Sequence, residues 1–227
     1  MCGIAGIYHL ETAKPVDPAR LRAMLHPMSH RGPDGSGEWT APGVGLGHLR
    51  LSIIDIEGSP QPMASDDEAV TISFNGEIYN FRQLRAELED RGHRFRTSGD
   101  TEVILAAWRQ WGPDCLSRLN GMFAFAIHDH QRGCLFLARD RLGVKPLHFA
   151  RLSDGSIAFA SELKGLLRHP LLRREANLSA VEDFLALGYV PDDNCIMAGV
   201  SKLGAGHYLL LDRGKLGVRV QRCDAAS

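Results

Sequence analysis

The fold class of this 227-residue chain is decided by two uninterrupted apolar stretches, MFAFAI at residues 122–127 and LFLA at residues 135–138. A strand with one face in water alternates apolar and polar residues, whereas a strand covered on both faces does not. Residues 128–133 between the two stretches are rich in turn formers and predict a hairpin. We therefore expect a sheet that is buried on both faces.

Sequence on either side of this hairpin predicts a mixed order of strands and helices. Alternation predicts strands at residues 44–54 and 70–74, and the first of these should carry Arg50 and Ser52 on one face. Because the elements do not repeat as strand–helix–strand units, a parallel sheet is disfavoured and an α+β fold with layers in the order helix, sheet, sheet, helix is expected. The other expected elements are strands at 2–8, 157–160, 206–212 and 218–221, helices at 17–26, 80–92, 100–111 and 178–188, and a glycine-rich loop at 30–37.

Composition argues against several classes of function. The formal net charge is -1 and no dense Lys/Arg run occurs, which disfavours nucleic acid or an anionic membrane as the main partner. No apolar run approaches the roughly 20 residues that span a bilayer, and no signal peptide is expected. The 5 cysteines are scattered and form neither a disulfide framework nor a metal-binding pair, so no metal and a reducing, cytoplasmic setting are expected.

Cys2 is the first candidate for chemistry because it follows the initiator methionine. Removal of Met1 would leave Cys2 with a free α-amino group, and such groups have a reference pKa of about 7.7–8.0. That amine could take the proton of the thiol in the same residue, so Cys2 would supply both nucleophile and base. The alternative is that Cys2 is a small apolar residue at the start of a strand.

Several other features have a functional or a structural interpretation. Asn75-Gly76 could hold an oxyanion or form a turn, and Arg50 could bind a carboxylate or make a structural salt bridge. Asp100 is expected as a helix cap, as is Asn80, which forms a capping pair with Gln83. The pair at 128 and 130, both histidines, is expected in a solvated turn rather than at a metal.

Seven motifs occur together in a characteristic order. They are CGIAG at 2–6, HRGPD at 30–34, GHLRLSI at 47–53, FNGEIYN at 74–80, DTE at 100–102, GMFAFA at 121–126 and ARDRLGVKPL at 138–147. This set resembles the N-terminal glutaminase domain of glutamine-dependent asparagine synthetases, a class II glutamine amidotransferase of the N-terminal-nucleophile hydrolase fold. The resemblance extends from Cys2 to about Gln221 and departs at His148-Phe149, where relatives often have an aromatic pair.

The resemblance implies a four-layer αββα sandwich of mostly antiparallel strands and a site for L-glutamine. Its implied catalytic and substrate-binding residues are Cys2, released by loss of Met1; Asn75 and Gly76 as the oxyanion hole; Arg50 for the α-carboxylate; Glu77 and Asp100 for the α-ammonium; and Ile53 in the substrate pocket. It also implies an amidotransferase domain over residues 1–222, with 223–227 as a truncated tail where a synthetase domain would begin.

Hydrolysis of glutamine is not expected to need a cofactor. The pyrophosphate-binding motif of the synthetase domain is missing, so ATP and Mg are expected only in that domain or in a separate partner. The ammonia acceptor is left open between aspartate and another acid. Two alternatives also stay open: a catalytically idle remnant or interaction module that binds glutamine or a synthetase partner, and an amidase that acts on another amide.

Overall fold

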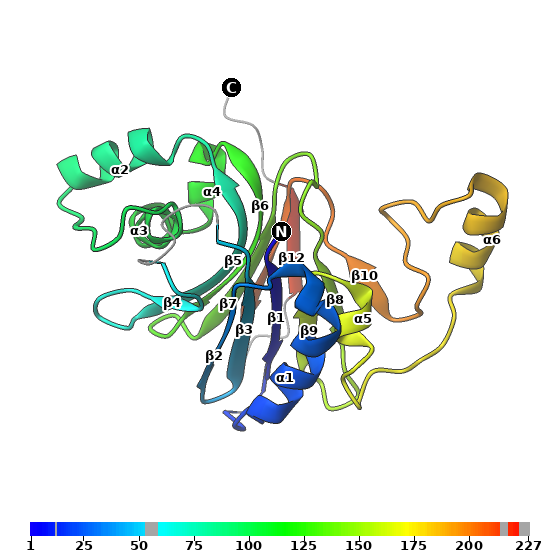
Figure 1. Ribbon diagram of the computed structural model, residues 1–227. Helices are drawn as coiled ribbons and strands as arrows, with labels where there is room; N and C mark the ends of the chain where they lie inside the picture. The colour runs from blue at the N-terminus through cyan, green and yellow to red at the C-terminus, as the bar shows by residue number, and fades with distance from the viewer. Residues whose placement is uncertain (12, 53–58, 214–217, 223–227) are drawn as a thin grey trace.

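The computed structural model describes residues 1–11, 13–52, 59–213 and 218–222, and its core is a pair of stacked antiparallel sheets. Figure 1 shows the two sheets standing face to face, with helices on the outer side of each. In spatial order the first sheet contains β10 (Val200–Lys202), β8 (His148–Arg151), β9 (Ile157–Ala160), β1 (Gly3–Tyr8), β3 (Val44–Arg50) and β2 (Gly35–Ala41). The second contains β12 (Val218–Arg222), β11 (His207–Asp212), β7 (Cys134–Arg139), β6 (Gly121–Asp129), β5 (Val70–Ile78) and β4 (Met63–Ala64).

Three hydrophobic clusters hold the layers together. One lies between the sheets, where side chains of β1 and β3 meet those of β6 and β7. A second packs the first sheet against α1 (Pro18–Leu25), the 3₁₀ helix η1 (His26–Arg31) and α5 (Leu163–Leu166). The third packs the second sheet against α2 (Phe81–Asp90), α3 (Thr101–Trp111) and α4 (Cys115–Arg118), and the 3₁₀ turn η2 (Gly112–Asp114) links the last two. Both sheets are therefore covered on both faces, as the unbroken apolar stretches predicted.

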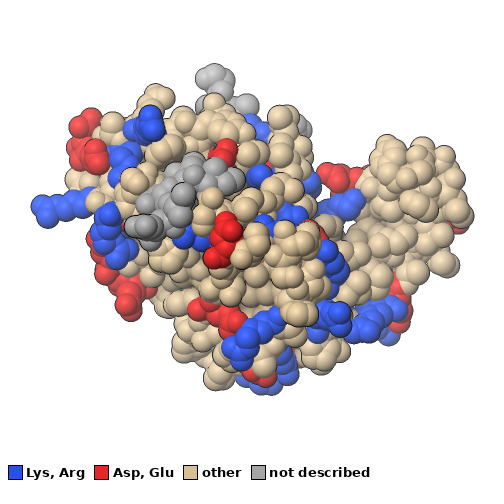
Figure 2. Space-filling view, viewed as in Figure 1, with Lys and Arg blue, Asp and Glu red and all other residues tan. Residues whose placement is uncertain are grey.

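The last helix, α6 (Leu178–Leu187), projects away from this sandwich (Figure 1). Of its side chains only Ala180 is buried, and Leu178, Phe184, Leu185 and Leu187 are exposed. In Figure 2 this lobe is largely free of charge, whereas acidic and basic side chains are interspersed over the rest of that face. None of the helices in the described part of the chain is long and apolar enough to cross a bilayer.

Several local predictions were wrong because long-range pairing overrode them. The segment expected as a loop at 30–37 ends η1 and begins β2, which pairs with β3. Asn80 precedes α2 but does not cap it, since its Nδ2 donates to the Arg118 carbonyl and its Oδ1 accepts from Asn120 N. His128 is not in a solvated turn: it lies in β6, 3% exposed, with both ring nitrogens buried and unpartnered within the described chain.

Candidate active site

Cys2 lies at the head of β1, which is a central strand between β3 and β9. Gly3 pairs with Leu49 of β3, and this register brings the Cys2 thiol to the segment that follows β3. The Leu51 N–H donates to Cys2 Sγ at 3.3 Å, and Sγ donates to the Leu51 carbonyl at 3.5 Å. The thiol is half-buried and not in a disulfide. The nucleophile candidate is therefore held at the end of a rigid strand.

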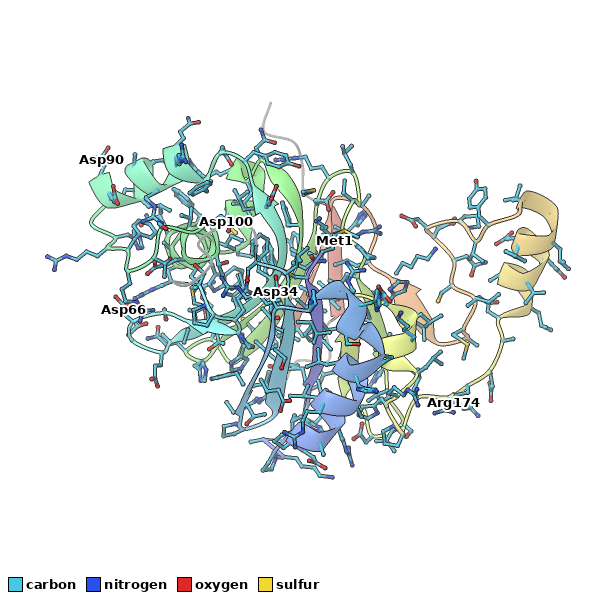
Figure 3. The ribbon with its side chains drawn as sticks, in the orientation of Figure 1. Met1, Asp34, Asp66, Asp90, Asp100 and Arg174 are labelled. Atoms are coloured by element: carbon cyan, nitrogen blue, oxygen red, sulfur yellow. The ribbon has the colours of Figure 1, made fainter. Side chains whose placement is uncertain are left out.

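A cavity opens beside Cys2 at the ends of β1, β3 and β5. It is lined by four of the predicted site residues besides Cys2, namely Arg50, Gly76, Glu77 and Asp100. Met1 also lines it, and Figure 3 shows Met1 and Asp100 near the centre of the view, where these strands end. Ile53 lies outside the described residues. Stretches that are far apart in the sequence therefore meet at one cavity.

Arg50 ends β3, and the chain that follows it is anchored by the HRGPD motif. Asp34 Oδ2 accepts a hydrogen bond from Ser52 N at 2.8 Å, and Asp34 N donates to the Arg50 carbonyl at 3.0 Å. Arg50, Leu51 and Ser52 all line the cavity. The expectation that Arg50 and Ser52 share a face of a strand is replaced by this arrangement, because β3 stops at Arg50.

Asn75 and Gly76 do not form a turn, because β5 continues to Ile78. Asn75 pairs with Ala124 and Gly76 with Phe123 of β6. The Asn75 side chain is 1% exposed, and its Nδ2 has no hydrogen-bond partner within the described chain. It lies beside the cavity rather than among its lining residues. Buried amide donors normally have a hydrogen-bond acceptor. The Asn75 Nδ2 group is therefore a candidate to donate a hydrogen bond to a ligand oxygen.

Gly76 is required by its backbone surroundings. A Cβ at this position would lie 2.2 Å from the Met122 carbonyl oxygen and 2.8 Å from the Phe123 Cα. Any larger residue would therefore push β5 away from β6 at the cavity wall. The close approach explains why a glycine occurs inside a strand here.

Two acidic side chains face the cavity from different elements. Glu77 comes from β5, and Asp100 immediately precedes α3. The prediction that the Asp100 side chain caps α3 was wrong. Its Oδ2 instead accepts a hydrogen bond from Ile78 N at 2.9 Å. Burial raises the pKa of Asp100, and the nearby negative charge of Glu77 raises it further. The cavity therefore contains two neighbouring carboxyl groups, whose charged forms a bound cation would stabilise.

The loop before Asp100 is built by another buried carboxylate. Glu102 accepts hydrogen bonds from Arg96 N, Thr97 N and the Thr97 hydroxyl, at 2.8 to 3.0 Å. Arg85 donates to the carbonyls of Thr97 and Gly99 from the other side. These contacts fix the backbone that presents Asp100 to the cavity.

Lys145 is a cavity residue that the sequence analysis did not single out. Its side chain is 5% exposed and lines the cavity together with Met122, Gln61 and Thr101. The loop that carries it is organised by Asp140, whose carboxylate accepts from four backbone N–H groups, those of Phe123, Leu142, Val144 and Lys145. The signal for this residue was present in the ARDRLGVKPL motif, whose Asp and Lys are the two residues concerned.

Within the described ranges, no group of three or more His, Cys, Asp or Glu side chains is placed to hold a metal ion. The cavity instead presents a thiol, a strand edge, two cationic side chains and two carboxylates. These groups suit a small molecule that carries both a carboxylate and an ammonium, with a reactive carbonyl next to the thiol.

Comparisons with known proteins agree with this chemistry. The family model described as a glutamine amidotransferase domain matches residues 1–221. The chain is 38% identical over 222 residues to "Asparagine synthetase [glutamine-hydrolyzing] 3" of Bacillus subtilis, covering 96% of this chain and 36% of that protein. It is 39% identical over 167 residues to "Asparagine synthetase B [glutamine-hydrolyzing]" of Escherichia coli, covering 74% of this chain and 30% of that protein. It thus spans about a third of the length of these relatives.

Solved structures confirm the fold. Glutamine phosphoribosylpyrophosphate amidotransferase from B. subtilis, complexed with ADP and GMP, superposes with a TM-score of 0.68 at 22% identity, covering 98% of this chain and 49% of that one. A structure titled as the allosteric regulatory enzyme of purine biosynthesis gives a TM-score of 0.69 at the same identity. The predicted αββα sandwich of the N-terminal-nucleophile hydrolase type is correct.

Proposed function

This chain belongs to the glutamine amidotransferase domain family, and we propose that it hydrolyses L-glutamine to glutamate and ammonia through a thioester on Cys2. The observation that carries the proposal is the meeting of Cys2, Arg50, Gly76, Glu77 and Asp100 at one cavity. Nothing in a purely structural role would require a thiol, a guanidinium and two carboxylates to line the same hollow.

The reaction begins with the loss of Met1, which frees the Cys2 α-amine and clears part of the cavity wall. The amine takes the thiol proton, and Sγ attacks the side-chain carbonyl carbon of glutamine. The oxyanion that forms is stabilised by Asn75 Nδ2 and the Gly76 N–H. The C–N bond then breaks, the protonated amine returns its proton to the leaving group, and ammonia departs. Water, deprotonated by the same amine, attacks the thioester and releases glutamate and the thiol.

Charge complementarity gives the proposed selectivity for free glutamine. Arg50 binds the α-carboxylate, and Glu77 with Asp100 binds the α-ammonium. A peptide-linked or N-acetylated glutamine lacks one or both charges, so it would leave charged groups of the site unpaired and bind poorly. Ile53 is proposed as a further contact of the substrate.

The proposal extends to a larger assembly because the relatives are longer. We propose a domain over residues 1–222 whose ammonia is used by a synthetase domain or a separate synthetase partner, with ATP and Mg bound there and not here. Aspartate is the acceptor that the relatives' names suggest, and another acid remains the alternative. A cytoplasmic location is supported by the absence of disulfides among Cys2, Cys115, Cys134 and Cys195.

The test is glutamate release from free glutamine by the purified chain, compared with Cys2→Ala. We expect activity in the first, none in the second and equal thermal stability in both. Intact-mass measurement should show active protein without Met1; active protein that keeps Met1 would exclude the free-amine mechanism. Binding of glutamine without turnover would favour the idle or interaction module, and full turnover in Arg50→Ala would favour an amidase for another amide.

A further inference from the structure

The buried guanidinium of Arg31 forms a hydrogen bond with the backbone of Cys2. Arg31, the last residue of η1, is 7% exposed, and its Nε donates to the Cys2 carbonyl oxygen at 2.8 Å. Its Nη1 donates to Glu162 Oε1 at 2.7 Å. The two bonds leave the guanidinium between Cys2 on one side and a carboxylate on the other.

The Glu162 carboxylate has two further side-chain partners. Oε1 also lies 3.1 Å from His30 Nε2, and Oε2 lies 3.0 Å from Lys164 Nζ. Burial opposes ionisation of Glu162, but hydrogen bonds from Arg31, Lys164 and His30 outweigh it and lower its pKa to about 2. Glu162 is therefore a carboxylate at all pH values at which the protein would work.

Ser161, the residue before Glu162, forms hydrogen bonds with the backbone of β1 at Ile4. Ser161 Oγ accepts from Ile4 N at 2.9 Å, and Ser161 N donates to the Ile4 carbonyl at 2.9 Å. Ser161, Glu162 and Arg31 together form what we call the head clamp of β1. It immobilises the backbone on either side of Gly3.

The head clamp and Leu51 together determine where the Cys2 α-nitrogen points. The carbonyl of Cys2 is held by Arg31, and its Sγ is held by the Leu51 N–H and carbonyl. The Cα of an L-residue has fixed chirality, so fixing the carbonyl carbon and the side chain leaves the nitrogen only one direction. We propose that Glu162, acting through Arg31, is a positioning residue that aims the Cys2 α-amine at its own thiol and at the leaving group.

This inference rests on the proposed glutaminase function, and it adds a requirement to it. A buried arginine without its counter-ion is costly, and the usual response is to shift toward solvent or another acceptor. Either movement would release the Cys2 carbonyl. A base displaced by about 1 Å can lower a rate by about 100-fold even when the mutated residue is remote from the chemistry.

The first test is Glu162→Gln, which keeps an oxygen acceptor but removes the charge. We expect kcat to fall by about 10- to 100-fold with little change in KM, because Glu162 does not line the substrate cavity. The cavity beside Cys2 is lined by the charged side chains of Arg50, Lys145, Glu77 and Asp100. Arg31 lies at the Cys2 carbonyl, and its counter-ion Glu162 also contacts His30 and Lys164. Loss of Glu162 leaves Arg31 uncompensated, so the acid limb of the kcat–pH profile should move to lower pH.

The second test asks whether Glu162 acts through Arg31. In an Arg31→Met background, Glu162→Gln should cause no further loss of kcat, so the double variant should match Arg31→Met alone. Glu38→Gln is the matched control: it removes a carboxylate from the surface pair with Arg22, and it should keep wild-type kcat. If Glu162→Gln does not fold, Glu162→Asp takes its place, since it keeps the charge but shortens the reach to Arg31.

Unchanged kcat and an unmoved acid limb in a folded Glu162 variant would overturn the inference, as would additive losses in the double variant. These outcomes differ from failure of the proposed function, in which the wild-type chain itself would release no glutamate. The alkylation rate of the Cys2 thiol by iodoacetamide gives a readout that needs no glutamine turnover. It should change in the Glu162 variant and stay at the wild-type value in Glu38→Gln.

Discussion

Replacement of Asn75 by alanine should separate stability from catalysis, because the side-chain amide of Asn75 is buried without an acceptor. Loss of one oxyanion donor lowers kcat by about 10²–10³, or about 2.7–4 kcal/mol of transition-state stabilisation. An unmade buried hydrogen bond costs about 1–3 kcal/mol in the resting protein, so its removal offsets most of the lost packing. We therefore expect a change within about 1 kcal/mol in the free energy of unfolding.

Ser73 provides the matched control two residues earlier on the same face of β5. Its hydroxyl is fully buried and donates to the Gly47 carbonyl at 3.0 Å, so this hydrogen bond is already made in the resting protein. Ser73→Ala should lose about 1–2 kcal/mol of stability while kcat stays close to wild type. The two variants should thus show opposite patterns.

The assay pairs single-turnover or steady-state glutamate release with urea unfolding of the same preparations. KM for glutamine should change little in Asn75→Ala, since the donor acts on the developing oxyanion. The reasoning would be refuted if Asn75→Ala lost several kcal/mol of stability and kept its kcat, because the amide would then be a structural group with a partner.

Three further predictions concern Gly76 and Asp100 at the cavity and Glu162 in the head clamp. Gly76→Ala should lower both the melting temperature and kcat, because its Cβ would meet the Met122 carbonyl at 2.2 Å; wild-type values in a thermal scan would contradict the predicted clash. Asp100→Asn should raise the KM for glutamine yet stabilise the fold at pH 7. The pKa of Asp100 is raised in the folded protein, so the folded protein holds this proton more tightly than the unfolded chain does. The stability that this proton contributes is greatest below the unfolded pKa of 3.8 and is lost as pH rises through the folded pKa. Denaturant unfolding at pH 7 and at pH 3 should show the gain only at pH 7. Glu162 has the opposite sign: its pKa of about 2 against an ordinary 4.5 gives stability that is present above 4.5 and lost as pH falls toward 2, and Glu162→Gln should abolish that acid-sensitive part of the unfolding curve.

The layered core could be predicted from sequence because burial on both faces leaves a local mark. The stretches 122–127 and 135–138 lack polar residues for that reason, and they form the paired strands β6 and β7. Three short strands carry no such mark and were not expected: β4 has only two residues, and β8 and β10 have four and three and include polar ones. β9 is as short as β8, but its four residues are all apolar, and it was expected. The existence of β4, β8 and β10 depends on neighbours that are distant in the sequence.

Five residues that the sequence analysis placed in a site do line one cavity, but the local structure around them differs from the prediction. Asn75-Gly76 favours a turn by local preference, yet β6 pairs with it across the whole dipeptide. Asp100 is a residue type that commonly caps helices, but its carboxylate accepts a hydrogen bond from Ile78 N on β5. In both cases a partner far along the chain decides the outcome, and a single sequence does not contain that information.

Lys145 and Glu162 are two charged residues whose structural roles could not be predicted from the sequence. Each is a charged residue in a short polar segment, where the common expectation is exposure to solvent. Lys145 is buried by the loop that Asp140 organises, and Glu162 accepts hydrogen bonds from three side chains. Only the folded structure distinguishes these two from the many charged residues on the surface.

The pairing of β1 sets a strict length requirement at the chain end. Gly3–Tyr8 pairs with β3 on one side, and residues 5–8 pair with β9 on the other. The strand therefore cannot slide by one residue without turning every side chain to the opposite face. One residue too many at the amino end would block the cavity, and one too few would remove the thiol. If the proposed free-amine mechanism operates, accurate removal of Met1 therefore matters as much to activity as any side chain of the site.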